Sequence, residues 1–168
     1  MKAIVVVDKK WGIGKRNDLL FSLPADMKHF RETTRGKTVV MGSNTLLSFP
    51  GGKPLPKRTN IVLWPGGEMR DDCIVLESLP EIFAEIAKYP ADEVFVVGGA
   101  MMYATMLSYC SEVIVTKVEA DGGAEVFFKN LDELSDFTIE SESEVIETNG
   151  YMIRFVVYKN NHVLPLPL

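Results

Sequence analysis

The chain has 168 residues, of which 46% are hydrophobic and 24% are charged, and its formal net charge is −5. These values predict one folded domain rather than a disordered chain, and the acidic balance argues against an obligate nucleic-acid-binding protein. The two cysteines and two histidines lie far apart and form no zinc-binding pattern, so we predict no metal site and reduced thiols in a cytoplasmic protein. No apolar run reaches the length of a membrane span.

The first half of the chain alternates short β-rich runs with helical stretches. The opening apolar run is too short for a signal-peptide core and fits a buried strand. A glycine-containing segment follows it, and Pro24 is suited to the first position of a helix. The elements predicted here are strands at 3–7, 38–41, 60–63 and 74–76 and helices at 24–33 and 43–48.

The second half contains a helix start signal and a hairpin signal. Ser78 and Glu81 have the capping-box spacing, which predicts a helix running to about Tyr89. Asn149-Gly150 is typical of a tight turn between antiparallel strands. The elements predicted here are strands at 93–97 and 113–118, a helix at 100–108, and a hairpin of strands 137–145 and 151–158. We expect a single domain over residues 1–159 and a tail without regular structure over 160–168.

Near-continuous apolar strands separated by helices indicate an α/β fold in which helices cover both faces of a mostly parallel sheet. The last two strands are expected to be antiparallel. Ligands of such sheets bind outside the carboxyl ends of the strands. Residues that follow strand ends are therefore the first candidates for a site.

Asp26 is an acid in an apolar neighbourhood that includes Leu23, Met27 and Phe30. Helical spacing lets Asp26, Met27 and Phe30 share or border one face. Such a carboxylate is suited to binding the paired N–H donors of a flat heterocycle and to managing its proton. The alternative interpretation is an ordinary acid in the first turn of a helix, where the helix dipole favours negative charge.

Two strand-to-helix junctions end in glycine, at Gly42 and at Gly98-Gly99. A missing side chain lets a ligand approach the backbone, and the free N–H groups of a helix start attract phosphate. Two such junctions can hold the two ends of a dinucleotide, although glycine at each can also serve strand-to-helix packing. The dinucleotide-binding glycine fingerprint and the phosphate-binding lysine motif are both missing from the sequence. Arg58, at a strand entrance, can bind a carboxylate or remain a solvated surface residue.

The order of these features resembles dihydrofolate reductase from residue 1 to about residue 159. The stretches that carry the resemblance are Gly12-Ile13-Gly14 with Asn17, Leu23-Pro24-Ala25-Asp26 with Phe30, Val40-Met41-Gly42 with Thr45, Pro54-Leu55-Pro56 with Arg58 and Asn60, Val97-Gly98-Gly99 with Tyr103, and Thr116. The resemblance implies an eight-stranded, mostly parallel sheet. It also implies NADPH-dependent reduction of 7,8-dihydrofolate to tetrahydrofolate, which supplies one-carbon and thymidylate metabolism.

The resemblance further implies residue roles. Asp26 would bind the pterin and assist protonation of N5, Thr116 would hydrogen-bond this acid, and Phe21 would form an apolar lid. Gly98-Gly99 matches a peptide that the family holds in cis, and residues 9–21 match a mobile loop. The implied substrate-binding residues are Ile4, Val5 and Val6 through their backbone, with Met27, Phe30, Phe49, Leu55, Arg58 and Val97. The implied cofactor-binding residues are Val6, Ile13, Gly14, Asn17, Leu19, Gly42, Ser43, Asn44, Thr45, Leu63, Trp64, Val97, Gly98, Gly99, Ala100, Met101, Met102 and Tyr103.

Three departures from the family pattern bear on mechanism. Phe21 stands where many members carry a tryptophan whose N–H can hold a water, and Leu20 replaces a frequent proline. Around the expected 2′-phosphate site, Ser43, Asn44, Trp64 and Met101 supply no cation, and Glu77 stands where some members have lysine. We therefore expect NADPH as the cofactor with weaker discrimination against NADH than usual.

Two other functions remain open from the sequence. One is a riboflavin-pathway pyrimidine reductase of the same fold, and the other is a catalytically idle pterin- or nucleotide-binding module. Asp26, Phe30 and Arg58 favour dihydrofolate as the substrate. The expected partners are dihydrofolate and antifolate inhibitors, with no nucleic acid or membrane, and the expected state is a monomer.

Overall fold

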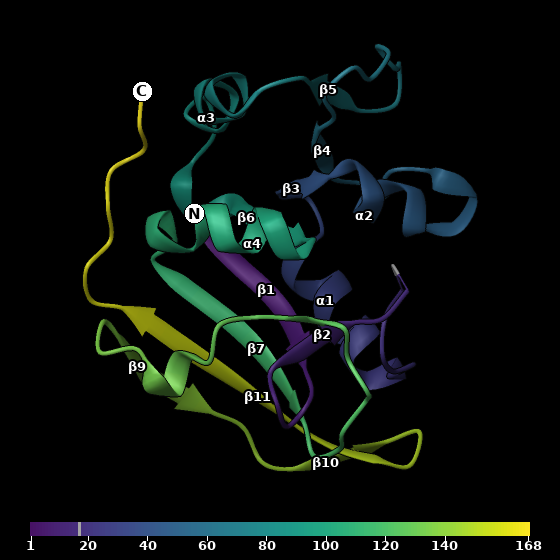
Figure 1. The fold of residues 1–168 in the computed structure, drawn as a ribbon, viewed down its shortest axis with the longest axis vertical. Helices are drawn as coiled ribbons and strands as arrows, with labels where there is room; N and C mark the ends of the chain where they lie inside the picture. The colour runs from purple at the N-terminus through teal and green to yellow at the C-terminus, as the bar shows by residue number, and fades with distance from the viewer. Residues whose placement is uncertain (17) are drawn as a thin grey trace.

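A computed structural model describes residues 1–16 and 18–168. One large sheet has the strand order β10-β11-β7-β1-β6-β3-β4-β5, and β9 also pairs with β11 (Figure 1). The five contacts among β1, β3, β4, β5, β6 and β7 are parallel, whereas β11 pairs antiparallel with β7, β9 and β10. The mostly parallel α/β sheet with an antiparallel C-terminal end is as predicted. The strands are β1 (Lys2–Val7), β3 (Thr38–Gly42), β4 (Thr59–Leu63), β5 (Ile74–Leu76), β6 (Val94–Gly98), β7 (Glu112–Val118), β9 (Phe137–Glu142), β10 (Ile146–Thr148) and β11 (Tyr151–Asn160).

The helices lie on both faces of the sheet. They are α1 (Pro24–Thr34), α2 (Ser43–Ser48), α3 (Leu79–Ile86) and α4 (Ala100–Met106). Short 3-10 helices occupy 50–52, 91–93, 107–109 and 131–133. Ser78 accepts a hydrogen bond from the Glu81 N–H at 3.4 Å, as the capping-box prediction requires. The predicted end at about Tyr89 was wrong, because α3 stops at Ile86 and only a turn over Ala87 and Lys88 follows it.

Strand alternation separates the core into two layers. In β3, Val39 and Met41 pack with Leu46 of α2, whereas Val40 packs with residues of α3 and α4. Successive side chains of a strand point to opposite faces, so every second residue joins the same layer. Phe30 of α1 packs against the layer that contains Val39 and Met41. Helices α1 and α2 therefore cover one face, and α3 and α4 cover the other.

The C-terminal hairpin differs in detail from the prediction. Asn149 and Gly150 have φ values of 51° and 83°, which suits the predicted tight turn between β10 and β11. The strand predicted at 137–145 ends at Glu142 as β9, and a separate strand that was not predicted, β10, leads into the turn; β9 and β10 pair with different parts of β11. The register shifts between Val157 and Tyr158, so a bulge interrupts the ladder there. After β11, the Leu164 N–H donates to the Ser108 carbonyl at 3.0 Å, and the tail runs back along the molecule.

A small second sheet was not predicted. It joins β2 (Gly12–Gly14) to β8 (Val126–Phe127), two segments that are more than 110 residues apart in the chain. The buried carboxylate of Asp8 holds both regions, because it accepts from the N–H groups of Gly12 at 2.7 Å and Gly122 at 3.0 Å. This arrangement anchors the segment that leads from β1 to α1. No helix among the residues described is long and apolar enough to cross a membrane.

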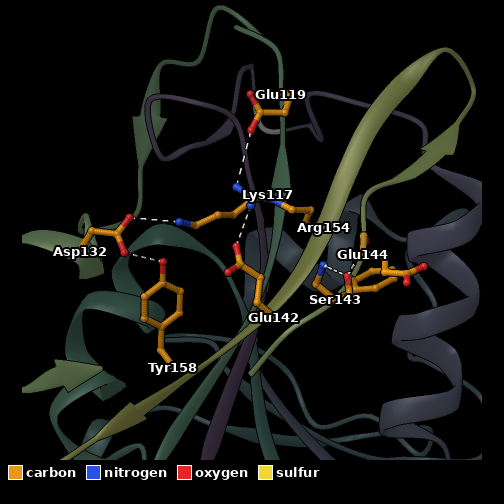
Figure 2. Close-up of polar contacts among 9 residues, drawn as sticks. Lys117, Glu119, Asp132, Glu142, Ser143, Glu144, Arg154 and Tyr158 are labelled. Atoms are coloured by element: carbon orange, nitrogen blue, oxygen red, sulfur yellow. Dashed lines mark hydrogen bonds and ion pairs between the residues drawn. The ribbon is translucent and has the colours of Figure 1, made fainter. Parts of the chain in front are cut away.

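A polar cluster joins Lys117 of β7 and Tyr158 of β11 through Asp132 (Figure 2). Asp132 accepts from the Tyr158 hydroxyl at 2.7 Å and from Lys117 Nζ at 3.0 Å. Lys117 Nζ also lies 5.2 Å from the ring centroid of Trp11. Burial and the adjacent Asp132 carboxylate raise the pKa of Tyr158, so its hydroxyl remains a donor at neutral pH. The cluster thus connects the sheet to the start of the loop after β1.

We predict that Tyr158→Phe lowers the free energy of unfolding by about 1–2 kcal/mol, since it removes a hydrogen bond to a charged group and keeps the ring. Urea denaturation of both proteins at neutral pH measures this loss. Tyr89→Phe is a matched control, because it also removes a tyrosine hydroxyl that donates to a carboxylate. Its acceptor, Glu85, lies only four residues away in the chain, so this contact is local. An equal loss in the two variants would contradict the structural role of the Tyr158 contact.

Candidate active site

A cavity of about 340 Å³ opens between α1, β1 and the segment that precedes α1. Its lining is largely apolar, and Asp26 is its only titratable group besides Asp18 among the described lining residues. Four residues that the sequence did not single out for binding also line it, namely Asp18, Leu20, Ser22 and Leu23. Asp18 and Leu20 lie in the loop 9–21 that the resemblance implied, and Ser22 and Leu23 directly precede α1.

Asp26 reaches this cavity because of how α1 begins. Pro24 occupies the first turn, as predicted, and Leu23 is only 3% exposed. Leu23 offers no side-chain cap, but the Ala25 N–H donates to the Thr148 hydroxyl at 3.2 Å. A residue from the C-terminal hairpin thereby satisfies one of the free N–H groups of the helix start. This contact fixes the turn that carries Asp26 against the sheet.

Thr116 of β7 donates its hydroxyl hydrogen bond to Asp26 Oδ1 at 2.6 Å. Thr116 is 1% exposed and lies between Val6 and Phe155 in the sheet register. Burial raises the pKa of Asp26 above its usual value, while the Thr116 hydrogen bond and the nearby His29 oppose that rise. Thr116 therefore holds the Asp26 carboxylate in place, and burial makes that carboxylate bind a proton more readily than an exposed acid.

His29 is a neighbour of this acid that the sequence prediction missed. It lies one turn along α1 from Asp26 and stacks on Phe155, with a centroid distance of 4.1 Å. Burial lowers the pKa of His29, although Asp26 and Glu32 pull it upward. Its Nε2 is buried without a hydrogen-bond partner in the described structure. Its three-residue spacing from Asp26 was the only available signal.

Tyr103 connects helix α4 to strand β1. Its hydroxyl donates to the Ile4 carbonyl at 2.7 Å, and burial, followed by the Asp26 charge, raises its pKa. The peptide between Gly98 and Gly99 is cis, as the resemblance implied. Gly98 has φ +132°, and a Cβ there would lie 3.1 Å from Thr45 Oγ1. The ends of β3 and β6 thus lie close together, and the glycines there leave the backbone uncovered by side chains.

Arg58 is held at the far end of α1. Its Nε donates to the Thr34 hydroxyl at 2.9 Å, and its guanidinium carbon lies 5.8 Å from the Phe30 ring centroid. Burial lowers the pKa of Arg58, with further contributions from Arg31 and Arg35. Arg31, Arg35 and Arg58 place three positive charges at the C-terminal end of α1, and the sequence analysis had indicated only Arg58. The remaining guanidinium N–H groups of Arg58 are suited to a carboxylate.

The predicted site residues fall into groups in the structure. The cavity lining contains Val6, Ile13, Leu19, Phe21, Asp26 and Met27. The adjoining apolar layer contains Ile4, Phe30, Phe49, Leu55, Trp64 and Val97. The strand ends carry Gly42, Ser43, Asn44, Thr45, Gly98, Gly99, Ala100 and Met101.

Some predicted residues lie elsewhere. The side chains of Val5, Leu63, Met102 and Tyr103 pack in the layer beneath α3 and α4, so Val5 can face the cleft only through its backbone. Gly14 pairs with Val126 in the small sheet. Asn17 lies outside the described residues.

Comparison with known proteins identifies this arrangement. The family model described as dihydrofolate reductase matches residues 1–160. The dihydrofolate reductase of Bacillus subtilis is 33% identical over 162 residues, which cover 95% of this chain and 94% of that protein. The enzyme of Staphylococcus haemolyticus is 31% identical over 159 residues and 93% of each chain.

A solved structure of dihydrofolate reductase from Enterococcus faecalis complexed with NADP(H) and RAB-propyl has a TM-score of 0.83 and 30% sequence identity, over 95% of each chain. The riboflavin-pathway alternative is not favoured by these matches. The chain therefore belongs to the dihydrofolate reductase family and is an NADPH-dependent enzyme of dihydrofolate reduction.

Proposed function

We propose that Asp26 is the group that binds and activates dihydrofolate in this cleft. The observation that carries the proposal is the carboxylate that lines an apolar cavity and accepts a hydrogen bond from a buried threonine at 2.6 Å. Such a carboxylate accepts hydrogen bonds from the amino group and ring N–H of the pterin. Its negative charge favours protonation of N5, which makes C6 a better hydride acceptor.

Bound NADPH supplies the hydride for C6. The chain's own part is to orient the reactants and exclude water. Phe21, Leu19 and Ile13 line the cavity from the loop before α1 and would shield the reacting atoms. The side chain of Phe21 has no N–H donor, so a water near N5 would have to be held by Asp26 and Thr116 instead.

The substrate tail is proposed to run along α1 toward Arg58. Met27 of the cavity lining and Phe30, Phe49 and Leu55 of the adjoining apolar layer supply surface for the benzoyl portion, and Arg58 binds the glutamate α-carboxylate. The Thr34 hydrogen bond supports this role because it fixes the guanidinium beside the Phe30 ring.

The residues at the carboxyl ends of β3 and β6 fit a bound dinucleotide, with its nicotinamide beside Gly98 and Gly99. The backbone at Gly98 and Gly99 is free of side chains, and Tyr103 fixes the adjoining β1 carbonyl. The first turns of α2 and α4 offer N–H groups without helical acceptors to the pyrophosphate. We also propose that the protein acts as a monomer in the cytoplasm with small-molecule ligands, antifolates among them. The free thiols of Cys73 and Cys110 support a reducing compartment.

Asp26→Asn tests the catalytic assignment. We expect kcat/KM for dihydrofolate to fall by about 10²- to 10⁴-fold at neutral pH, since general acid–base catalysis commonly contributes that much. The loss should shrink at low pH, where solution supplies the proton, and binding should change less than turnover. Absorbance at 340 nm measures turnover, with Asp136→Asn as an exposed control. Unchanged turnover at neutral pH would contradict the assignment.

The same variant tests the burial of the charge. The pKa of Asp26 is raised in the folded protein from 3.8, so its ionisation destabilises folding as pH rises through the raised value. This unfavourable contribution is absent below about pH 3.8 and complete above the folded pKa. We therefore expect Asp26→Asn to raise the free energy of unfolding at pH 7 but not near pH 3.5, measured by urea denaturation. A less stable variant at pH 7 would be inconsistent with a desolvated carboxylate.

Arg58→Gln tests the tail-binding site. We expect the KM for dihydrofolate to rise about 10- to 100-fold, because a charge-assisted pair is lost. A 6-methyl dihydropterin, which lacks the glutamate, is the matched substrate and should show little change. An equal rise for both substrates would indicate that Arg58 acts only through the structure of α1.

A further inference from the structure

The carboxyl ends of β3, β4 and β5 bring three residues into one row. The register pairs Gly42 with Leu63 and Leu63 with Leu76, so the residues that follow them are neighbours along the sheet edge. Those residues are Ser43, Trp64 and Glu77. Strand spacings of about 4.8 Å put β5 roughly 14 Å from β6. A dinucleotide with its nicotinamide beside Gly98 would place its adenosine end at this row.

Glu77 is fixed at this edge. Its Oε1 accepts from the Gly66 N–H at 3.2 Å, across the turn that follows β4. The backbone N–H of Trp64 donates to the Leu76 carbonyl at 2.8 Å, which ties that turn to the end of β5. Oε2 of Glu77 has no hydrogen bond to any residue of the described chain, and the side chain is exposed. One carboxylate oxygen is therefore available to a ligand.

The charge at this edge is negative. The fully described segment 64–78 contains four acids, Glu68, Asp71, Asp72 and Glu77, and one cation, Arg70. Both Arg70 Nε and Nη2 bind Asp72, at 2.9 and 2.8 Å, and Nη2 also donates to a loop carbonyl. Helices α2 and α4, which are also fully described, contain no lysine or arginine. These segments offer no unpaired cation to a 2′-phosphate. The residues at the adenosine end therefore fit the 2′-phosphate of NADPH poorly, whereas the residues around Gly98 and Gly99 fit a nicotinamide.

We propose that Glu77 is a specificity-determining residue that accepts a hydrogen bond from the 2′-hydroxyl of the adenosine ribose and repels a 2′-phosphate. Dinucleotide sites of the Rossmann type use an acid to bind the ribose 2′-hydroxyl and an arginine to bind a 2′-phosphate, and the same chemistry applies to an acid at this sheet edge. The enzyme consequently uses NADH as well as NADPH, with similar affinities. This inference rests on the proposed function, because it assumes that the dinucleotide lies along the β6-β3-β4-β5 edge.

The test compares cofactor binding in wild type, Glu77→Gln and the control Glu68→Gln, which removes an exposed acid from the same loop. Glutamine keeps the acceptor for the Gly66 N–H, so the turn is preserved. Calorimetry gives Kd for NADPH and NADH, and for adenosine 2′,5′-bisphosphate and AMP as probes of the adenosine end alone. We expect wild type to bind NADH and NADPH within about ten-fold of each other. Glu77→Gln should tighten NADPH and the bisphosphate by about 5- to 30-fold and leave NADH and AMP within about five-fold.

Ionic strength gives a second readout on the unaltered protein. Raising salt from about 20 to about 300 mM screens repulsion, so the wild-type affinity for NADPH should rise relative to NADH. A cation-based phosphate site would show the opposite trend. That opposite trend, or the same Kd values in Glu77→Gln and Glu68→Gln, would overturn the role of Glu77. Dihydrofolate-dependent oxidation of either dinucleotide at 340 nm is measured separately, since its absence would defeat the proposed function and leave the binding result readable.

Discussion

The hydrogen bond between Thr116 and Asp26 is the contact on which the rest of the site depends. A carboxylate in an apolar cleft loses hydration, and a short hydrogen bond from a buried hydroxyl offsets part of that loss. The donor comes from β7 and the acceptor from α1, so the sheet and the helix must dock correctly for the pair to form. Thr148 strengthens that docking by capping Ala25 from the C-terminal hairpin. The site is therefore a product of tertiary structure rather than of one local motif.

The same arrangement gives the two ends of the cleft different charges and hydrogen-bonding groups. Asp26 binds protons more readily than a surface acid, whereas burial makes His29, one turn away, less ready to hold one. At the far end of α1, Arg58 keeps its charge beside Phe30 and two further arginines. A ligand that fits the cleft must therefore offer hydrogen-bond donors at one end and a negative charge at the other. Dihydrofolate has both features, on its pterin and its glutamate.

The sequence predicted elements well where hydrophobic periodicity and punctuation residues agreed. The helix at 43–48 and the strand at 74–76 have the predicted bounds, and Asn149-Gly150 forms the predicted turn. The predicted strand at 137–145 ends early, at Glu142, and the separate strand β10 was missed, because β9 and β10 pair with different parts of β11 and that pairing depends on tertiary structure. The small sheet of β2 and β8 was missed because its strands are short and distant in sequence. Likewise, the position of Asp26 in a helix was predictable, whereas its contact with Thr116, which lies 90 residues away, required the fold or the family resemblance.

A crystal structure of the ternary complex with folate and oxidised cofactor tests the central claim most directly. We expect both Asp26 carboxylate oxygens within hydrogen-bond distance of the pterin amino group and ring nitrogen, with Thr116 still bonded to Oδ1. We also expect the nicotinamide to lie against the Gly98-Gly99 backbone. A pterin bound elsewhere, with the Asp26 side chain turned into open solvent, would contradict the role of Asp26.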